Sequence, residues 1–137
     1  SNVLAGIGRA QIDILDNHIS KRRSMNDFYT GIFQSAKGVS VFKEYSSDIS
    51  SNHWLSCITI DESKACFNNE DLRLKLNKLN IESRPLWKPM HLQPIFKNYK
   101  FYGSSVAEDI FNKGLCLPSG SNINKDDRNR IEKAIFS

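Results

Sequence analysis

The sequence lacks any long apolar run and any recognisable leader segment. Among its 137 residues, no apolar stretch approaches the roughly 20 residues that a membrane-spanning helix requires. The first residues, SNVLAGIGRAQ, have neither the basic start nor the apolar centre of a signal peptide. We therefore expect a cytoplasmic protein with no membrane partner.

Cysteine is scarce, and its three occurrences are not spaced for a shared site. The sequence has an odd number of cysteines, and no two of them form a C-x-x-C pair; they are Cys57, Cys66 and Cys116. This pattern argues against a disulfide framework and against a zinc site. We expect buried or half-buried free thiols in a reducing compartment, and no bound metal.

Familiar catalytic motifs are also absent. The stretch GIGRA at 6–10 follows no strand and lacks the third glycine of a phosphate-binding loop, so we interpret its small residues as part of a helix that packs closely against a neighbour. No G-x-S-x-G is present, and no spacing of Ser, His and Asp suggests a catalytic triad. We therefore exclude a hydrolase.

What is present is the composition of one folded domain with a mild basic excess. Hydrophobic residues make up 39% and charged residues 25% of the chain, which is the ordinary globular range. A net charge of +4 could serve a nucleic-acid partner, but the basic residues are spread along the chain. The one dense cluster, SKRRS at 20–24, lies in a helical pattern near acidic residues, and we interpret it as a solvated helix face or a subunit contact. No nucleic-acid partner is expected.

Helical periodicity predicts one long N-terminal helix and three shorter ones. Val3, Ile7 and Ile14 begin an apolar pattern that continues to Phe33, with Ser1 placed as the cap. A helix of about thirty residues would span roughly 45 Å, more than a small domain needs, so we expect something outside the chain to pack on one end. The shorter helices are predicted at 68–80, 104–114 and 124–136, with asparagine caps on the first and last and Gly114 ending the second.

Strands are predicted at 53–61, 81–85 and 115–120, with a further short strand possible at 39–45. The first is rich in aromatic and β-branched residues, and Pro118 and Gly120 end the last. The order of elements favours the α+β class, with a three-stranded sheet covered by helices that include the long N-terminal one.

The stretch ESRPLWKPMHLQP, residues 82–94, combines three prolines with aromatic and basic side chains. Pro85, Pro89 and Pro94 fix φ, remove backbone donors and push the preceding residues out of the helical region. A long helix is therefore excluded. The stretch is predicted to be a stiff, extended connection that holds Trp87 and His91 in a fixed relation, as a ligand-facing loop requires.

Of the three histidines, His91 is the candidate for ligand binding. His18 lies in the predicted first helix and His53 opens a predicted strand, and both are interpreted as surface or capping side chains. His91 lies in the proline-rich stretch, where an imidazole can donate to or accept from a polar ligand near neutral pH. The competing interpretation is a histidine that only hydrogen-bonds its own loop.

The motif of Arg84-Pro85, Trp87, Pro89, His91 and Gln93-Pro94 resembles the C-terminal part of the DegT/DnrJ/EryC1/StrS family of pyridoxal-phosphate-dependent sugar aminotransferases. The stretches SNVLAGIGRAQIDILDNHISKRR before it and VAEDIFNKGLCLPSGSNINKDDRNRIEKAI after it extend the resemblance over nearly the whole chain. Within the family it is most similar to enzymes that aminate UDP-4-keto-6-deoxy-N-acetyl sugars on the route to bacillosamine-type sugars. The resemblance implies that residues 1–137 are the small C-terminal domain of a fold-type I pyridoxal-phosphate-dependent transferase.

The resemblance also implies a cofactor, pyridoxal 5'-phosphate, held by a large domain that this chain does not contain. That domain would carry the cofactor lysine, so no catalytic residue is expected here and the chain alone should be inactive. The intact homodimeric enzyme would transfer an amino group from glutamate to a nucleotide-linked keto sugar, in cell-surface polysaccharide or glycan biosynthesis. Its active sites would lie at the subunit interface.

By resemblance, His91, Trp87 and Lys88 are placed near the nucleotide-sugar substrate. Arg84 is equally expected to be a structural ion-pair partner, and Asn2 is expected to neighbour an upstream segment that contacts the cofactor phosphate. Two alternatives remain open at this point. The chain could be a stand-alone binding module of the same fold, or the small domain of a related sugar dehydratase in which histidine replaces the cofactor lysine.

Overall fold

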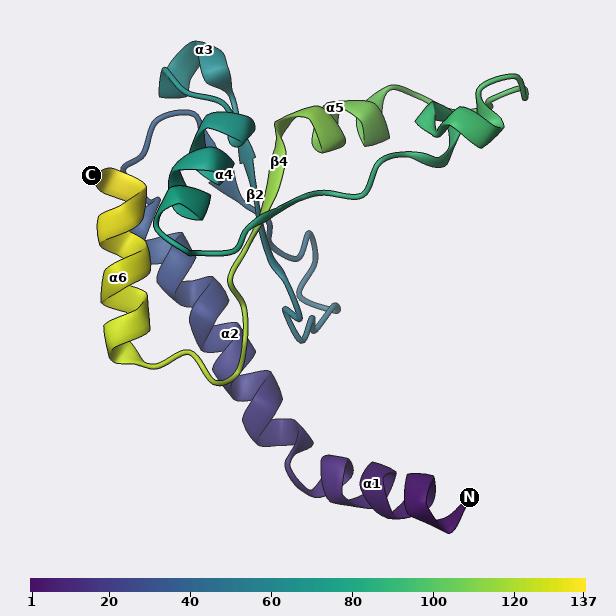
Figure 1. Cartoon of the computed structure of the whole chain (residues 1–137), viewed down its shortest axis with the longest axis vertical. Coiled ribbons are helices and arrows are strands. Elements are labelled where there is room, and N and C mark those ends of the chain that lie inside the picture. Colours follow the sequence, from purple (N-terminus) through teal and green to yellow (C-terminus); the bar gives the residue numbers. More distant parts are fainter.

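A four-stranded antiparallel sheet with the strand order β1-β2-β4-β3 lies at the centre of the molecule (Figure 1). The structure, a computed structural model, describes all of residues 1–137. The strands are β1 (Val39–Val41), β2 (Ser56–Ile60), β3 (Arg84–Pro85) and β4 (Gly114–Leu117). The helices are α1 (Asn2–Asp13), α2 (Leu15–Ile32), α3 (Glu62–Ala65), α4 (Asn69–Lys78), α5 (Val106–Lys113) and α6 (Lys125–Phe136), and the 3-10 turns are η1 (Met90–Leu92) and η2 (Pro94–Phe96).

The expected α+β class is confirmed, and the sheet gains a fourth strand. Val39 of β1 pairs with Ile60 of β2, so the short stretch at 39–41 joins the sheet at its edge. The predicted first strand begins at Ser56 and not at 53, because His53 has a left-handed φ of 44° that an extended strand does not accommodate. None of the helices combines the length and the apolar character needed to cross a bilayer.

One face of the sheet carries the hydrophobic core. Ile58, Ile60, Leu115 and Leu117 are each at most 2% exposed, and burial alternates along β2 as it does in a half-buried strand. Helices α2, α4 and α6 lie against this face (Figure 1) and complete the core with residues that include Met25, Tyr29, Leu72, Leu76, Ile131 and Ile135. Burying each large apolar side chain contributes roughly 1.5–3 kcal/mol. The core therefore fixes the positions of β2 and β4.

The predicted single N-terminal helix is two helices that separate at Ile14, so the prediction of one continuous helix was wrong. Ile14 has φ −111° and ψ 3°, and α1 leaves the body of the molecule at an angle to α2 (Figure 1). Helix α2 buries residues against the sheet, whereas α1 buries none, so no packing within the chain aligns the two. Ser1 caps α1 as expected, since the Leu4 N–H donates to Ser1 Oγ at 3.5 Å.

The apolar residues of α1 are left uncovered. Val3, Leu4 and Ile12 are 69–72% exposed and Ile7 is 55% exposed. No atom lies within 4 Å of a Cβ built at Gly6 or Gly8, so the close packing expected of this helix is not made within the chain. The expected surface without an internal partner is confirmed, and we call Val3, Leu4, Ile7 and Ile12 the α1 patch.

The three shorter predicted helices are present as α4, α5 and α6. Asn68 and Asn124 each cap a helix, and each is paired with an aspartate, Asp71 or Asp127, in a reciprocal capping box. Gly114 ends α5 as predicted, and a close backbone contact explains why it must be glycine. A Cβ at Gly114 would lie 2.5 Å from the backbone carbonyl oxygen of Ile110, which cannot move away as a side chain can.

Candidate functional site

The proline-rich stretch begins before β3 and continues into an arm, residues 86–105, that extends from β3 and returns to the body through α5 (Figure 1). The backbone is extended at Pro89 and at Gln93, where ψ is 142° in both cases. The two 3-10 turns interrupt this extended course, but no long helix forms. The arm therefore has the non-helical character that its prolines predict.

His91 is held in the arm by contacts on two sides. Its Nε2 lies 2.8 Å from Oε1 of Glu108 in α5, and its ring stacks on Phe101 with the centroids 3.7 Å apart. An ionised carboxylate can only accept a hydrogen bond, so Glu108 places the ring proton on Nε2. Nδ1, which has no partner in the chain, is then left as an acceptor. His91 is thus oriented by another helix, and its second ring nitrogen has no hydrogen-bond partner in the chain.

Trp87 has a different environment from His91. Its side chain is 65% exposed, and its ring stacks on that of Trp54 with the centroids 5.9 Å apart and an angle of 25° between the planes. Lys88 is exposed. The three predicted site residues therefore lie on one segment, but only Trp87 is paired with the loop before β2.

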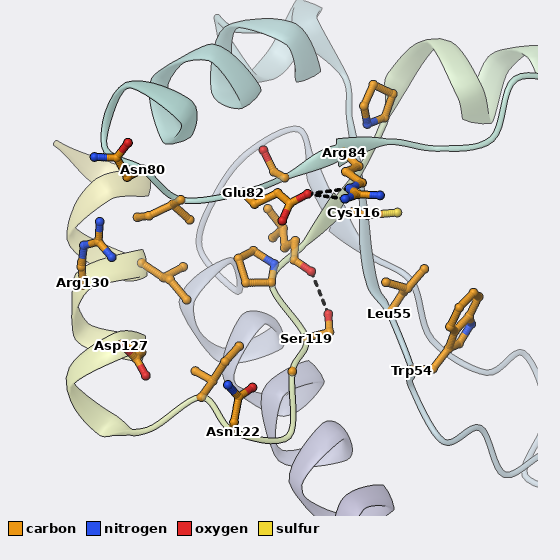
Figure 2. A pocket seen from close by; sticks show the side chains of 18 of the residues that line it. Trp54, Leu55, Asn80, Glu82, Arg84, Cys116, Ser119, Asn122, Asp127 and Arg130 are labelled. Atoms are coloured by element: carbon orange, nitrogen blue, oxygen red, sulfur yellow. Dashed lines mark hydrogen bonds and ion pairs between the residues drawn. The ribbon is translucent and has the colours of Figure 1, made fainter. Parts of the chain in front are cut away.

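A pocket of about 680 Å³ lies between β3, β4, the start of α6 and the Trp54 segment (Figure 2). Its lining includes both tryptophans, Arg84, Arg130, Asn80 and Ser119, but neither Lys88 nor His91. Aromatic walls with a few polar groups are typical of small-molecule sites. Trp87, at the start of the arm, therefore lines this pocket, whereas His91 lies further along the arm and does not.

The cations of the pocket are accessible. Arg84 Nε donates to Glu82 Oε1 at 2.7 Å, and the two side chains are 77% and 72% exposed (Figure 2). The expectation of an ion pair at Arg84 is confirmed, although an exposed pair of this kind contributes at most about 1 kcal/mol. Arg130, which the sequence did not single out, donates to the carbonyl of Leu79.

Comparison with known proteins identifies the family. The model of the DegT/DnrJ/EryC1/StrS aminotransferase family matches residues 1–136. The chain belongs to this family. EpsN of Bacillus subtilis, assigned as a pyridoxal phosphate-dependent aminotransferase, is 42% identical over 99% of this chain and 35% of its own length. A GDP-perosamine synthase of Escherichia coli O157:H7 is 34% identical over 87% of this chain and 31% of its own length.

Solved structures of other aminotransferases show the same fold. The sugar aminotransferase Spr1654 of Streptococcus pneumoniae, in its PLP form, matches with a TM-score of 0.84 at 18% identity, over 98% of this chain and 34% of that one. PseC of Helicobacter pylori, an aminotransferase of pseudoaminic acid biosynthesis, matches with a TM-score of 0.79 at 21% identity, over 94% and 34% of the two chains. The chain therefore spans about a third of the length of the relatives that it matches.

The lysines of this chain lack the surroundings that a pyridoxal phosphate site requires. A lysine that forms a Schiff base needs a pocket that lowers its pKa or aligns it with the cofactor. Every lysine except Lys75 is exposed, and Lys75 Nζ donates to the Ile135 carbonyl at 3.1 Å. The residues of this chain therefore do not make a complete site for the cofactor.

The remaining histidines have partners within the chain. His18 Nδ1 lies 2.6 Å from Ser121 Oγ, and His53 Nε2 lies 3.2 Å from Glu44 Oε1. The backbone N–H groups of Glu44 and Ser51, with a smaller effect of His53, lower the pKa of the Glu44 carboxyl. Both histidines were predicted to be surface or capping side chains, but each is half-buried and has a side-chain partner within the chain.

The basic cluster at 20–24 has a structural role that the sequence did not indicate. Arg22 Nη1 donates to the Trp54 carbonyl at 2.7 Å, and Arg23 Nε donates to the Ser51 carbonyl at 2.9 Å. The cluster thus fastens the loop before β2 to helix α2, and it is not only a solvated face. Since this loop carries Trp54, the same contacts also position one wall of the pocket.

The side chains that contact His91 and Trp87 were not predicted from the sequence. Glu108 lies 17 positions after His91, and Trp54 lies far before Trp87, so no local spacing relates them. The pairing of β3 with β4 and the packing of α5 bring them together. An acidic residue in the first turn of the predicted helix at 104–114 was the only local signal for Glu108.

Proposed function

We propose that this chain is the small domain of a pyridoxal-phosphate-dependent aminotransferase that acts on a nucleotide-linked keto sugar, with glutamate as the amino donor. The observation that carries the proposal is the 42% identity to EpsN over 99% of the chain. The GDP-perosamine synthase and a dTDP-4-amino-4,6-dideoxy-D-glucose transaminase of Escherichia coli, among the relatives, support the nucleotide-sugar class. The sequence motif favours UDP-4-keto-6-deoxy-N-acetylglucosamine as the acceptor.

Within this proposal, the chain contributes binding and not the proton-transferring lysine. The exposed lysines described above support a cofactor site formed mainly by the rest of a longer protein. The cofactor supplies an electron sink for the amino transfer. His91, Trp87 and Lys88 are proposed to lie against the nucleotide-sugar, and Asn2 near the cofactor phosphate.

His91 is proposed to accept a hydrogen bond from a sugar hydroxyl. Glu108 holds the proton on Nε2, and Phe101 fixes the plane of the ring, so the free lone pair of Nδ1 has a defined direction. Little ordering entropy is lost when a preorganised side chain binds its ligand. Trp87 would contribute an apolar wall.

A homodimer with active sites at the subunit interface belongs to the same proposal. The α1 patch is exposed in this chain, and α1 and the arm both project from the body (Figure 1). A nucleic-acid partner has less support, because Arg22 and Arg23 of the one basic cluster are bound to loop carbonyls. A cytoplasmic setting and a role in polysaccharide biosynthesis stay part of the proposal.

The experiment is a two-stage assay of the full-length protein that contains this chain. Glutamate should convert the bound cofactor from its aldehyde to its amino form, and the UDP-linked keto sugar should then restore the first absorbance band. Borohydride reduction of a separate sample that has not met glutamate should label one lysine outside residues 1–137. Failure of glutamate to change the absorbance, or a stoichiometric label on a lysine of residues 1–137, would overturn the proposal. Restoration by GDP- or dTDP-linked keto sugars alone would overturn the UDP assignment.

A further inference from the structure

Two cysteines lie opposite each other on neighbouring strands. Cys57 of β2 and Cys116 of β4 are direct partners in the antiparallel register, and their sulfur atoms are 3.7 Å apart. They point away from the face that carries Ile58 and Leu115, because successive residues of a strand alternate between faces. The third cysteine, Cys66, lies in another segment, after α3.

The backbone geometry of this pair is suited to a covalent link. The carbonyl of Cys57 accepts a hydrogen bond from the Phe42 N–H, so the polar backbone groups of Cys57 point toward the β1 side. Toward β4, Cys57 and Cys116 therefore form a non-hydrogen-bonded pair, in which the Cα atoms are about 4.5 Å apart and the side chains approach closely. Disulfides span Cα distances of about 4.4–6.8 Å. Side-chain rotation alone can bring the two sulfur atoms to bonding distance.

The surroundings make one thiol more reactive than the other. Either thiol can donate the hydrogen bond between the two sulfur atoms; when Cys57 donates, the bond lowers the pKa of Cys116, whereas the same bond and burial raise the pKa of Cys57. Arg84 is the register partner of Cys116 on β3, and Figure 2 shows the sulfur of Cys116 beside the Arg84 side chain. The thiolate is the nucleophilic form of a cysteine.

Small oxidants can reach the pair. Cys57 is half-buried, and Cys116, although only 7% exposed, is part of the lining of the pocket. The other pocket walls nearby, Arg84 and Trp87, are exposed. A hydrogen peroxide molecule is smaller than the pocket, and it has to reach only one of the two sulfur atoms.

We propose that Cys57 and Cys116 form an oxidisable dithiol, a modification site at which hydrogen peroxide converts two free thiols into a cross-strand disulfide. The Cys116 thiolate attacks one peroxide oxygen, the O–O bond breaks, and the departing hydroxide takes up a proton as water, which leaves a sulfenic acid on Cys116. The Cys57 sulfur then attacks the Cys116 sulfur, and the S–O bond breaks with loss of a second water. The two thiols lose two electrons, and the peroxide gains them.

The disulfide would link β2 to β4, and Arg84 is the neighbour of Cys116 on the next strand, β3. A small thiol would reverse the reaction by thiol–disulfide exchange. The site does not depend on the proposed transamination, because both sulfur atoms belong to this chain and neither is assigned a part in that reaction.

The test is a cysteine map of the full-length protein after mild oxidation. The reduced protein is treated with equimolar hydrogen peroxide, its remaining thiols are blocked with N-ethylmaleimide, and its peptides are analysed by mass spectrometry. We expect a peptide pair joined through Cys57 and Cys116, with the mass of two hydrogen atoms lost, while Cys66 carries the blocking group. Dithiothreitol should restore blocking at both cysteines.

Matched variants separate this outcome from general oxidation. Cys57→Ser and Cys116→Ser should each abolish the joined peptide, and Cys66→Ser should leave it unchanged. If a serine variant does not fold, the unmodified protein still provides the test, because its cysteines are either joined in one peptide pair or blocked by N-ethylmaleimide. Full blocking of Cys57 and Cys116 after oxidation, sulfinic acid without a joined peptide, or cross-links that involve Cys66 would overturn the proposal.

Discussion

Single side chains in this domain acquire their roles from partners distant in sequence. His91 is an example, because Glu108 and Phe101 determine which of its nitrogen atoms carries the proton and in which plane its ring lies. Tyr29 is another. It is fully buried, its hydroxyl donates to the Pro118 carbonyl at 2.8 Å, and burial raises its pKa well above the usual range.

Replacing His91 by alanine in the full-length protein is expected to slow the second half-reaction more than the first. The loss of one hydrogen bond to the sugar should cost about 1 kcal/mol, or up to about 3 if the partner is charged. Glutamate is small and need not reach the nucleotide-sugar, so its half-reaction should change little. Each half-reaction is measured separately by cofactor absorbance. His18→Ala is the control, and equal losses in both half-reactions would indicate a structural histidine.

Replacing Tyr29 by phenylalanine is expected to lower the free energy of unfolding by about 1 kcal/mol, because the Pro118 carbonyl loses its donor while the apolar packing stays. Urea unfolding followed by circular dichroism measures the change. Tyr45→Phe is the matched control, since Tyr45 is 92% exposed. An equal effect of the two substitutions would contradict the role given to the Tyr29 hydroxyl.

At the scale of elements, caps and packing act together. Helices α4 and α6 begin with capping boxes that can be recognised from sequence, and both pack against the sheet. Helix α1 has a cap and an apolar face but no packing partner. Local signals therefore predict that a helix forms, whereas its direction follows from what it packs against.

Replacing Asn124 by alanine is expected to destabilise the domain by about 1 kcal/mol, within the range of about 0.5–2 for lost N-caps. The Asp127 N–H would lose the Asn124 side chain that accepts its hydrogen bond at 3.0 Å. Thermal or urea unfolding provides the measurement. Asn129→Ala, at an exposed position of α6, serves as the control and should change stability by less. No difference between the two variants would show that the cap contributes nothing here.

At the scale of the whole molecule, α1 and the arm give the domain an open outline (Figure 1). The α1 patch consists of four side chains that are 55–72% exposed. An exposed apolar surface of this kind is typical of an interface. Residues that cover the α1 patch must therefore come from outside the chain.

We expect the 137-residue chain alone to self-associate through the α1 patch. The double substitution Leu4→Gln with Ile7→Gln should weaken this association without lowering the stability of the domain, because α1 buries no residue within the chain. Sedimentation velocity over a range of concentrations measures the association, and urea unfolding measures the stability. Asp13→Asn, on the same helix, is the control. A wild-type chain that stays monomeric at every concentration would contradict this prediction.

The sequence by itself determined the fold class, the places of α4, α5 and α6, and the non-helical proline-rich segment. These features depend on local physics: apolar periodicity, asparagine caps, a glycine stop and the fixed φ of proline. The family motif was equally local, because its residues lie within 82–94. The family assignment of the chain is confirmed.

Only the tertiary structure decided the direction of α1, the pairing of β1 into the sheet and the partners of the site residues. Ile14 is no recognised helix breaker, and the helix divides there because only α2 has a sheet to pack on. Glu108 meets His91, and Cys57 meets Cys116, through contacts between segments whose separation carries no sequence signal. Strand register and helix packing follow from burying the core as a whole, and no local stretch contains that information.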